Sequence, residues 1–405
     1  MNDAVLPRLR ALLGTAGVER DPDGLPRATP DSDEAVSQVC RLAHEEGWKI
    51  RLEGRGTWLP ADAPADLALS TRGLNRVISV SPADLVATVQ AGAQLEDVRR
   101  RLADEGMWLP LDPPGRPDRS IGSVVVTATA GPLRSGFGPV RDHILGCVVA
   151  TGDGRLVRAG GRVVKNVAGY DLTKLQVGGF GGFGVVTELH LRLRALPRSD
   201  VTLTARGPRD DLTLGARDLA HAGIAPAALE LLSPALAAEA DWVLAARFTG
   251  TEPAVQADVR ALLAESELPW QALAPDRTAA FWGLAARAAL AGPVTLRLGV
   301  LGDGLDEMLD LLARDLDEGL VSAGAASGML RWTGTATAER LRGIRHAAAA
   351  REAPMTIERA PWALRHAVGH FGAYREGVGR LVGRLRETFD PGACLTVALE
   401  GAANG

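Results

Sequence analysis

The residues best suited to ligand chemistry lie at positions 165–186, which read KNVAGYDLTKLQVGGFGGFGVV. Six glycines and two phenylalanines stand there beside an amide, a tyrosine and a lysine. Gly179, Gly181 and Gly184 form the pattern G-x-G-x-x-G, whose missing side chains let a pyrophosphate approach the start of a helix. Such a site requires a strand before the glycines and a helix after them.

The elements around these glycines run in the opposite order. Residues 169–176 read as a short helix, whereas VVTELHLRL after the glycines alternates as a strand does. The order disfavours a Rossmann-type site. Two other segments become candidates: residues 54–57, which end a strand, and the proline- and glycine-rich residues 112–141. Exposed N–H groups around glycines form anion-binding concavities, so a pyrophosphate could lie between these segments.

The pattern before residue 197 predicts an α+β domain that positions these segments. Asp31 and Glu34 begin a helix that ends at Gly47, and residues 49–53 form a strand. LALS, RVISV and LVATVQAG read as further strands, and residues 93–106 read as a helix. CVVATGDGRLVRAG predicts a hairpin.

After Pro197 the sequence changes to alanine-rich helices that alternate with short strands. This pattern predicts a second α+β domain, most simply an antiparallel sheet with helices on one face. A final helix over residues 363–389 is expected to end at DPG. The predicted division is therefore residues 1–197, 198–362, and 363–405 for a C-terminal helix and tail.

Composition excludes several classes of protein. The 405 residues are 46% hydrophobic and 23% charged with a net charge of -4, so neither nucleic acid nor an anionic membrane is an expected partner. Cys40, Cys147 and Cys394 lie too far apart in sequence for a disulfide framework or an iron-sulfur cluster, which favours the cytoplasm. Charged residues interrupt the apolar N-terminus, so we expect no signal peptide and no membrane span. Any membrane association would come through partner subunits.

Several motifs together resemble one family. The run GGRVVKNVAGYDLTKLQVGGFGGFGVVTELHLRL, preceded by LPLDPP, SIGSVVVTATAGP and GPVRDHILG, is similar to the FAD-binding domain of the vanillyl-alcohol oxidase and p-cresol methylhydroxylase superfamily. Within it, the chain most resembles the FAD-binding subunits of bacterial glycolate oxidases. The resemblance implies two α+β subdomains with FAD between them, and an α+β cap domain with an antiparallel sheet.

The resemblance also implies which residues bind FAD. The pyrophosphate loop would consist of Gly54, Arg55, Gly56 and Thr57. The contacts to the ribityl chain and ring would come from Pro113, Pro114, Ser120, Ile121, Gly122, Ala130, Gly131, Gly136, Arg141 and Asp142. The adenosine half would contact Gly184, Val186 and Thr187. The glycines at 178–184 would then let a loop and strand pack flat, without cradling a phosphate. Arg55 would either add a charge to the pyrophosphate or point outward.

Two departures from the family pattern limit the expected chemistry. Covalently flavinylated members have a histidine in or just after the pyrophosphate loop, where this chain reads RGTW, so we expect non-covalent FAD. Catalytic 2-hydroxy-acid dehydrogenases of the superfamily have a histidine-rich metal motif, of which only Gly302, Asp303 and Gly304 remain. We therefore expect no metal site.

Candidate catalytic residues are few, and each has an ordinary structural alternative. Arg331 or Arg297 could bind a substrate carboxylate, although Arg331 could equally pack its stem beside Trp332. His366 and His370 have metal-ligand spacing but no visible third ligand. Four polar residues near the start of residues 165–186 could contact the flavin or a partner subunit, or could equally brace the short helix. They are Lys165, Asn166, Tyr170 and Asp171.

Three hypotheses for the function follow. The first is an FAD-carrying subunit of a glycolate-oxidase-type complex, which works with a sister FAD-containing catalytic subunit and an iron-sulfur subunit in oxidising a small 2-hydroxy acid. The second is a free-standing FAD oxidoreductase acting on a hydroxy acid or another alcohol. The third is a scaffold that has kept the fold and lost the flavin.

Overall fold

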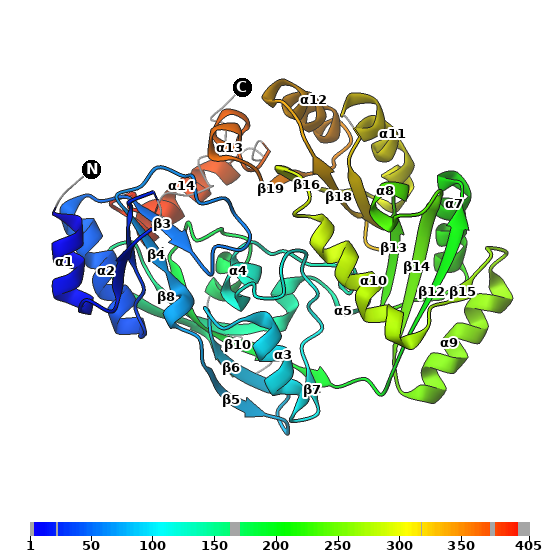
Figure 1. Cartoon of the computed structure of the whole chain (residues 1–405), viewed down its shortest axis with the longest axis horizontal. Helices are drawn as coiled ribbons and strands as arrows, with labels where there is room; N and C mark the ends of the chain where they lie inside the picture. Colours follow the sequence, from blue (N-terminus) through cyan, green and yellow to red (C-terminus); the bar gives the residue numbers. More distant parts are fainter. Residues whose placement is uncertain (1–3, 22, 163–170, 317, 373–376, 396–405) are drawn as a thin grey trace.

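A computed structural model describes residues 4–21, 23–162, 171–316, 318–372 and 377–395. Figure 1 shows two packed subdomains, with a cap domain beside them whose sheet carries helices. This architecture confirms the predicted α+β fold class. Helices and strands both contribute to each part of the molecule.

The first subdomain is a four-stranded sheet in the order β1-β2-β4-β3. Its strands are β1 (Val18–Arg20), β2 (Pro26–Ala28), β3 (Ile50–Glu53) and β4 (Leu67–Ser70), and two helices pack on it, α1 (Val5–Leu13) and α2 (Asp33–Glu46). Strands β2, β4 and β3 are parallel, whereas β1 is antiparallel to β2. The Ser32 hydroxyl caps α2 by accepting the Ala35 N–H, and Gly47 ends the helix with a φ of 70°.

The second subdomain is an antiparallel sheet in the order β5-β6-β10-β8-β9. Its elements are β5 (Val77–Ser81), β6 (Val86–Gln90), β8 (Ile144–Ala150), β9 (Leu156–Gly160), β10 (Val185–Arg192), α3 (Leu95–Ala103), α4 (Ile121–Val126) and α6 (Leu172–Gln176). The β8–β9 pairing confirms the predicted hairpin, and α6 precedes β10 as expected. Smaller elements are η1 (Thr71–Gly73), α5 (Arg134–Phe137) and η2 (Val140–His143), with the ribbon of β7 (Met107–Trp108) and β11 (Arg194–Ala195).

The cap domain is built on an eight-stranded antiparallel sheet in the order β15-β12-β14-β13-β17-β18-β16-β19. Its strands are β12 (Ser199–Gly207), β13 (Ala228–Leu232), β14 (Trp242–Gly250), β15 (Gln271–Ala272), β16 (Val294–Gly299), β17 (Leu320–Gly324), β18 (Met329–Gly334) and β19 (Met355–Arg359). The antiparallel arrangement agrees with the sequence pattern.

Helices cover both faces of this sheet, so the expectation of helices on one face was incomplete. The main cap core lies under α7 (Arg209–His221), α9 (Glu252–Glu265), α11 (Leu305–Asp315), which follows η3 (Gly302–Gly304), and α12 (Ala338–Ala349). The short α8 (Pro234–Ala237) and α10 (Pro275–Ala288) pack on the other face through Leu232, Val243 and Trp282. Side chains alternate between the faces of a strand, so β13 and β14 contribute to both cores.

The C-terminal region differs from the single predicted helix over residues 363–389. The chain forms α13 (Trp362–Val368) and α14 (Val378–Phe389) instead. Gly369 ends α13 with a φ of 84°, a conformation that favours glycine, and Phe371 then forms a bridge with Thr356. The chain finally returns to the first subdomain, where Leu395 pairs with Ile50 in parallel.

Candidate functional site

The loop over residues 54–61 encloses the first of two cavities that concern the predicted site. We call it the glycine-loop cavity; its volume is about 120 Å³. Its other walls come from α4, from Thr71 and Ala91, and from residues 180–186 at the start of β10. Of the predicted flavin contacts, it gathers Gly54, Arg55, Gly56, Thr57, Gly122 and Val186.

Glycine is needed at two of these positions for different reasons. A Cβ on Gly54 would lie 2.3 Å from the Ser120 hydroxyl, so the loop and the first turn of α4 approach each other closely. Gly56 has a φ of 68°, and no atom lies within 4 Å of the position its Cβ would take. The second glycine therefore leaves bare backbone beside open space.

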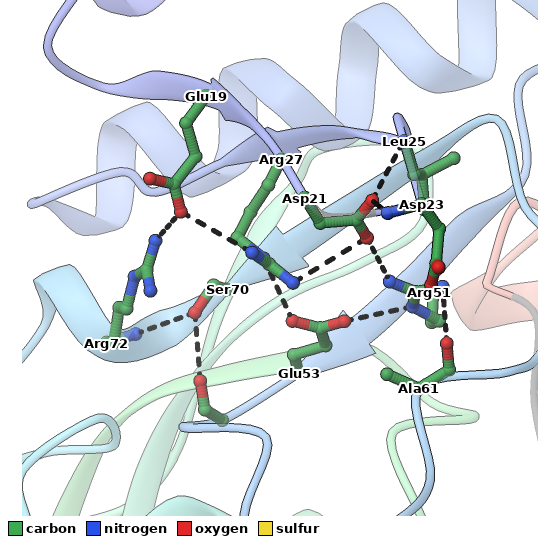
Figure 2. A network of polar contacts seen from close by, with 11 residues as sticks. Glu19, Asp21, Asp23, Leu25, Arg27, Arg51, Glu53, Ala61, Ser70 and Arg72 are labelled. Carbon is green, nitrogen blue, oxygen red and sulfur yellow. Dashed lines mark hydrogen bonds and ion pairs between the residues drawn. The ribbon is translucent and has the colours of Figure 1, made fainter.

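A charge network holds both ends of this loop. In Figure 2 the guanidinium of Arg51 donates to Asp21 at 2.8 Å, to Glu53 at 2.9 Å and to the Ala61 carbonyl at 3.0 Å. Glu53 also accepts from Arg27 at 3.2 Å. Since residues 51–53 end β3 and residue 61 closes the loop, these contacts fix where the loop leaves and rejoins the subdomain.

The second cavity lies between the second subdomain and the cap domain, and we call it the interdomain cavity. Its volume is about 410 Å³, which is within the usual range for small-molecule sites. One wall comes from Pro113 and Pro114, in the loop before α4 that we call the proline loop, and from Gly131, in the loop after α4. The cap domain contributes α10 and Arg331. The Gly115 N–H donates to the Ala286 carbonyl at 2.8 Å and joins the two domains at its rim.

Trp58 lies between the two cavities. It lines the glycine-loop cavity, and a Cβ added to Gly115, which lines the interdomain cavity, would lie 3.2 Å from its ring. The guanidinium carbon of Arg119 lies 4.2 Å from the centre of a Trp58 ring. Among the described residues, the buried indole N–H of Trp58 has no hydrogen-bond acceptor. A dinucleotide that occupied both cavities would pass this side chain.

The two arginines predicted to meet substrate are engaged by protein groups. Arg331 donates to Glu358 at 2.7 Å and to the Ala130 carbonyl at 2.7 Å. Arg297 lies 3.2 Å from the other Glu358 oxygen and donates to the Ala128 carbonyl at 3.0 Å. We call Arg297, Arg331 and Glu358 the interdomain triad, because it ties residues 128–130 to cap strands β16, β18 and β19.

The buried carboxyl groups of this region differ in pKa and therefore in charge. Burial by itself would raise the pKa of Glu358, but the charges of Arg331 and Arg297 more than offset it and lower that pKa. Loss of hydration raises the pKa of Asp112 to about 6, and burial raises that of Glu230 to about 8. Near neutral pH, Glu358 is therefore ionised and Glu230 holds a proton.

The other predicted contacts line neither cavity. Ser120, Ile121, Ala130, Gly184 and Thr187 are buried nearby, Gly136 packs on the backbone of Ala227, and Arg141 and Asp142 are exposed. Gly181 and Gly184 do pack closely, because added Cβ atoms would lie 2.6 Å from Leu52 and 2.4 Å from Val149. These glycines bring the loop close to both subdomains, whereas the predicted packing against the cofactor stays a prediction.

Some sequence candidates have structural roles, and others lie outside the described ranges. Asp171 caps α6 through the Lys174 N–H, while Lys165, Asn166 and Tyr170 lie outside the described residues. His366 stacks on Trp362, and His370 is buried against Phe180. Sequence analysis missed Trp58, Arg119 and Glu358. The first two flank recognised motifs, whereas no local pattern marked Glu358.

Comparison with known proteins identifies the ligand class of this region. The family model described as an FAD binding domain matches residues 26–160, which include the glycine loop and the proline loop. Solved structures show the fold alone, because they share only 14% of residues with this chain. They include 4-ethylphenol oxidase from Gulosibacter chungangensis (TM-score 0.76, covering 98% of this chain and 96% of that one) and an alkyldihydroxyacetonephosphate synthase (TM-score 0.73, covering 98% and 84%).

Curated relatives share more sequence over part of their length. Glycolate oxidase subunit GlcE of Escherichia coli (strain K12) is 38% identical over 33% of this chain and 39% of its own length. Subunit GlcD of Bacillus subtilis (strain 168) is 31% identical over 50% and 44%. D-2-hydroxyglutarate dehydrogenase of Xanthomonas citri pv. viticola is 35% identical over 45% and 40%. The chain thus spans less than half the length of these relatives. Residues 26–160 therefore carry a p-cresol methylhydroxylase-type FAD-binding domain, and FAD is its cofactor.

Proposed function

We propose that this chain is the FAD-binding subunit of a glycolate-oxidase-type complex that oxidises glycolate or a related small 2-hydroxy acid. The observation that carries the proposal is its similarity to two glycolate oxidase subunits, together with an FAD-binding match over a segment that contributes walls to both cavities. Partners would be a sister FAD-containing catalytic subunit and an iron-sulfur subunit. No helix in the described part of the chain is long and apolar enough to cross a bilayer.

The residues present fit the diphosphate and ring of FAD. Bare backbone at Gly56 and the Trp58 N–H, which has no acceptor among the described residues, supply donors in the glycine-loop cavity, and a buried guanidinium, Arg119, lies behind them. Bound FAD would supply the acceptor for the hydride and electrons. The protein would supply orientation through residues 54–57 and 113–114, and the interdomain triad would hold residues 128–130 in place.

The interdomain cavity supports a second candidate, a free-standing oxidoreductase. Arg331, Arg247 and Asp112 line a space of about 410 Å³, large enough for a small acid beside a flavin ring. Other relatives include D-lactate dehydrogenases, such as one from Saccharomyces cerevisiae (strain ATCC 204508 / S288c) that is 28% identical over 50% of this chain. A hydroxy acid would then be oxidised without a partner subunit.

Anaerobic titration distinguishes these functions. We expect the purified chain to show a flavin spectrum that glycolate, D-lactate and D-2-hydroxyglutarate leave unchanged until the sister subunit is added. Bleaching by an acid without any partner would instead support the free-standing enzyme. A chain that neither contains FAD nor takes it up would contradict both and leave the scaffold hypothesis.

The flavin is expected to dissociate when the protein is denatured. The loop that follows β3 reads Arg55, Gly56, Thr57 and Trp58, and offers no histidine for a covalent bond. Acid precipitation followed by absorbance of the pellet and supernatant measures this directly. Yellow colour that stays with the precipitated polypeptide would show a covalent link and contradict the prediction.

A further inference from the structure

The buried charges near the two cavities do not balance as those of the N-terminal network do. In that network three carboxylates, from Glu19, Asp21 and Glu53, are matched by the guanidiniums of Arg27, Arg51 and Arg72 (Figure 2). Beside the cavities, Arg119, Arg297 and Arg331 all lie in the field of Glu358, and Asp112 adds to the field at Arg331. Burial disfavours an uncompensated charge strongly, so the excess requires an explanation.

Arg119 is the cation of this group that has only neutral partners. It is 1% exposed, and no carboxylate oxygen of the described residues lies within 4.0 Å of it. Its guanidinium donates to Ser123 Oγ at 3.1 Å, the Pro114 carbonyl at 2.9 Å, Thr127 Oγ1 at 2.7 Å, Thr129 Oγ1 at 3.1 Å and the Ser123 carbonyl at 3.3 Å. The hydrogen bonds fix the position of the charge without neutralising it.

Nearby acids do not supply the missing charge. Glu358 already pairs with Arg331 and Arg297, and Glu230 holds its proton near neutral pH because burial raises its pKa to about 8. Burial raises the pKa of Asp112 only to about 6, so this carboxyl is ionised at neutral pH, but it accepts the Leu133 N–H at 3.0 Å and its charge acts on Arg331, not on Arg119. Burial also lowers the pKa of Arg119 to about 9, partly opposed by Glu358, so the guanidinium remains charged at neutral pH.

The position of Arg119 points to the glycine-loop cavity as the source of the counter-charge. Trp58, whose ring it faces, directly follows residues 54–57 and lines that cavity. Ser123 and Thr127, which accept its hydrogen bonds, line the same cavity. The charge therefore lies immediately behind one cavity wall, where low polarity strengthens its field.

We infer that Arg119 is the fixed positive charge by which this chain selects FAD, with its diphosphate, over flavins that have fewer or no phosphates. The inference rests on the proposed function, because it takes the glycine-loop cavity as the flavin site. Arg119 acts on the diphosphate through the cavity wall and is a specificity-determining residue. Backbone donors of residues 54–57 would make the direct contacts.

Flavin affinities of R119Q and R119K test the inference. FAD, FMN and riboflavin are titrated into flavin-free protein, and dissociation constants come from flavin fluorescence. We expect R119Q to weaken the binding of FAD at least tenfold, the binding of FMN by a smaller factor, and the binding of riboflavin less than threefold. R119K keeps the charge and is expected to retain most of the preference for FAD over riboflavin. R100Q, which removes a guanidinium that is 69% exposed on α3, is expected to change none of the three affinities.

The alternatives give distinct results. An equal loss of all three flavins in R119Q would mean that Arg119 only supports the fold, which overturns the inference while the FAD site stands. Equal affinity of the unaltered protein for FAD and riboflavin would overturn it too. Absence of any flavin binding would remove the proposed function itself. Should R119Q fail to fold, R119K provides the test by itself: the preference for FAD over riboflavin is expected to persist, and its loss in a folded R119K protein would contradict the inference.

Discussion

Replacement of Glu358 by alanine is expected to lower the free energy of unfolding by about 3–5 kcal/mol. Glu358 is 1% exposed and is the common partner of Arg331 at 2.7 Å and Arg297 at 3.2 Å. Without it, two nearly buried guanidiniums would lack their shared counter-ion. Their attachments to the Ala128 and Ala130 carbonyls would weaken as well, because the arginines could relax toward water. Denaturant unfolding at pH 7 measures the loss.

A matched surface pair provides the control for this prediction. Glu307 and Arg351 form an ion pair at 2.7 Å, but Glu307 is 61% exposed. E307A is therefore expected to cost only about 0–1 kcal/mol, the usual range for exposed pairs. Equal effects of E358A and E307A would show that the interdomain triad does not hold the cap on the FAD-binding domain. Local water entry that rescues both arginines would produce that outcome.

The sequence predicted those parts of the fold in which local pattern and tertiary packing agree. Alternating strands, the hairpin of β8 and β9, and the helix that ends at Gly47 all carry local signals, although Ser32 caps that helix and the predicted start was Asp31. The prediction of a single C-terminal helix was wrong, because the helical pattern of the sequence continues past Gly369, where α13 ends. Helices on the second face of the cap sheet were also missed, because the sequence of an amphipathic helix does not indicate which face of a sheet it covers.

The candidate site was predictable only as far as motifs extend. Residues 54–57 and 113–114 line cavities, and their glycine and proline pattern together with the family resemblance had selected them. The role of Glu358 was not predictable, because its partners come from strands 27 and more than 60 residues away in sequence. Arg119 was likewise hidden, because its lack of a carboxylate partner is a property of the folded environment.

A glutamine at position 230 is expected to remove a large part of the pH dependence of stability. Burial raises the pKa of Glu230 from an ordinary 4.5 to about 8, opposed by the Ser322 hydroxyl and Arg331, while Asp112 adds to the rise. Between these two pH values the folded state holds a proton that the unfolded state has released. Stability from this group is therefore complete below pH 4.5 and is lost as pH rises through 8.

The size of the effect follows from linkage. Each pH unit inside that window lowers the free energy of unfolding by up to about 1.4 kcal/mol. By pH 9 the loss caused by Glu230 should therefore be several times the usual effect of one substitution. E230Q resembles the protonated acid and does not titrate. We expect it to be close to the unaltered protein in stability at pH 5 and more stable at pH 9, as measured by urea unfolding across that range.

An exposed carboxylate gives the comparison that isolates burial as the cause. Glu265 lies at the exposed end of α9, and E265Q should therefore follow the pH curve of the unaltered protein closely. Asp112 is retained in all three proteins, so its own titration cancels in the difference apart from its coupling to Glu230. If E230Q differed from the unaltered protein by the same amount at pH 5 and pH 9, the carboxyl at position 230 would be ionised in the folded state. The field of Arg331, and not burial, would then dominate the electrostatics at this position.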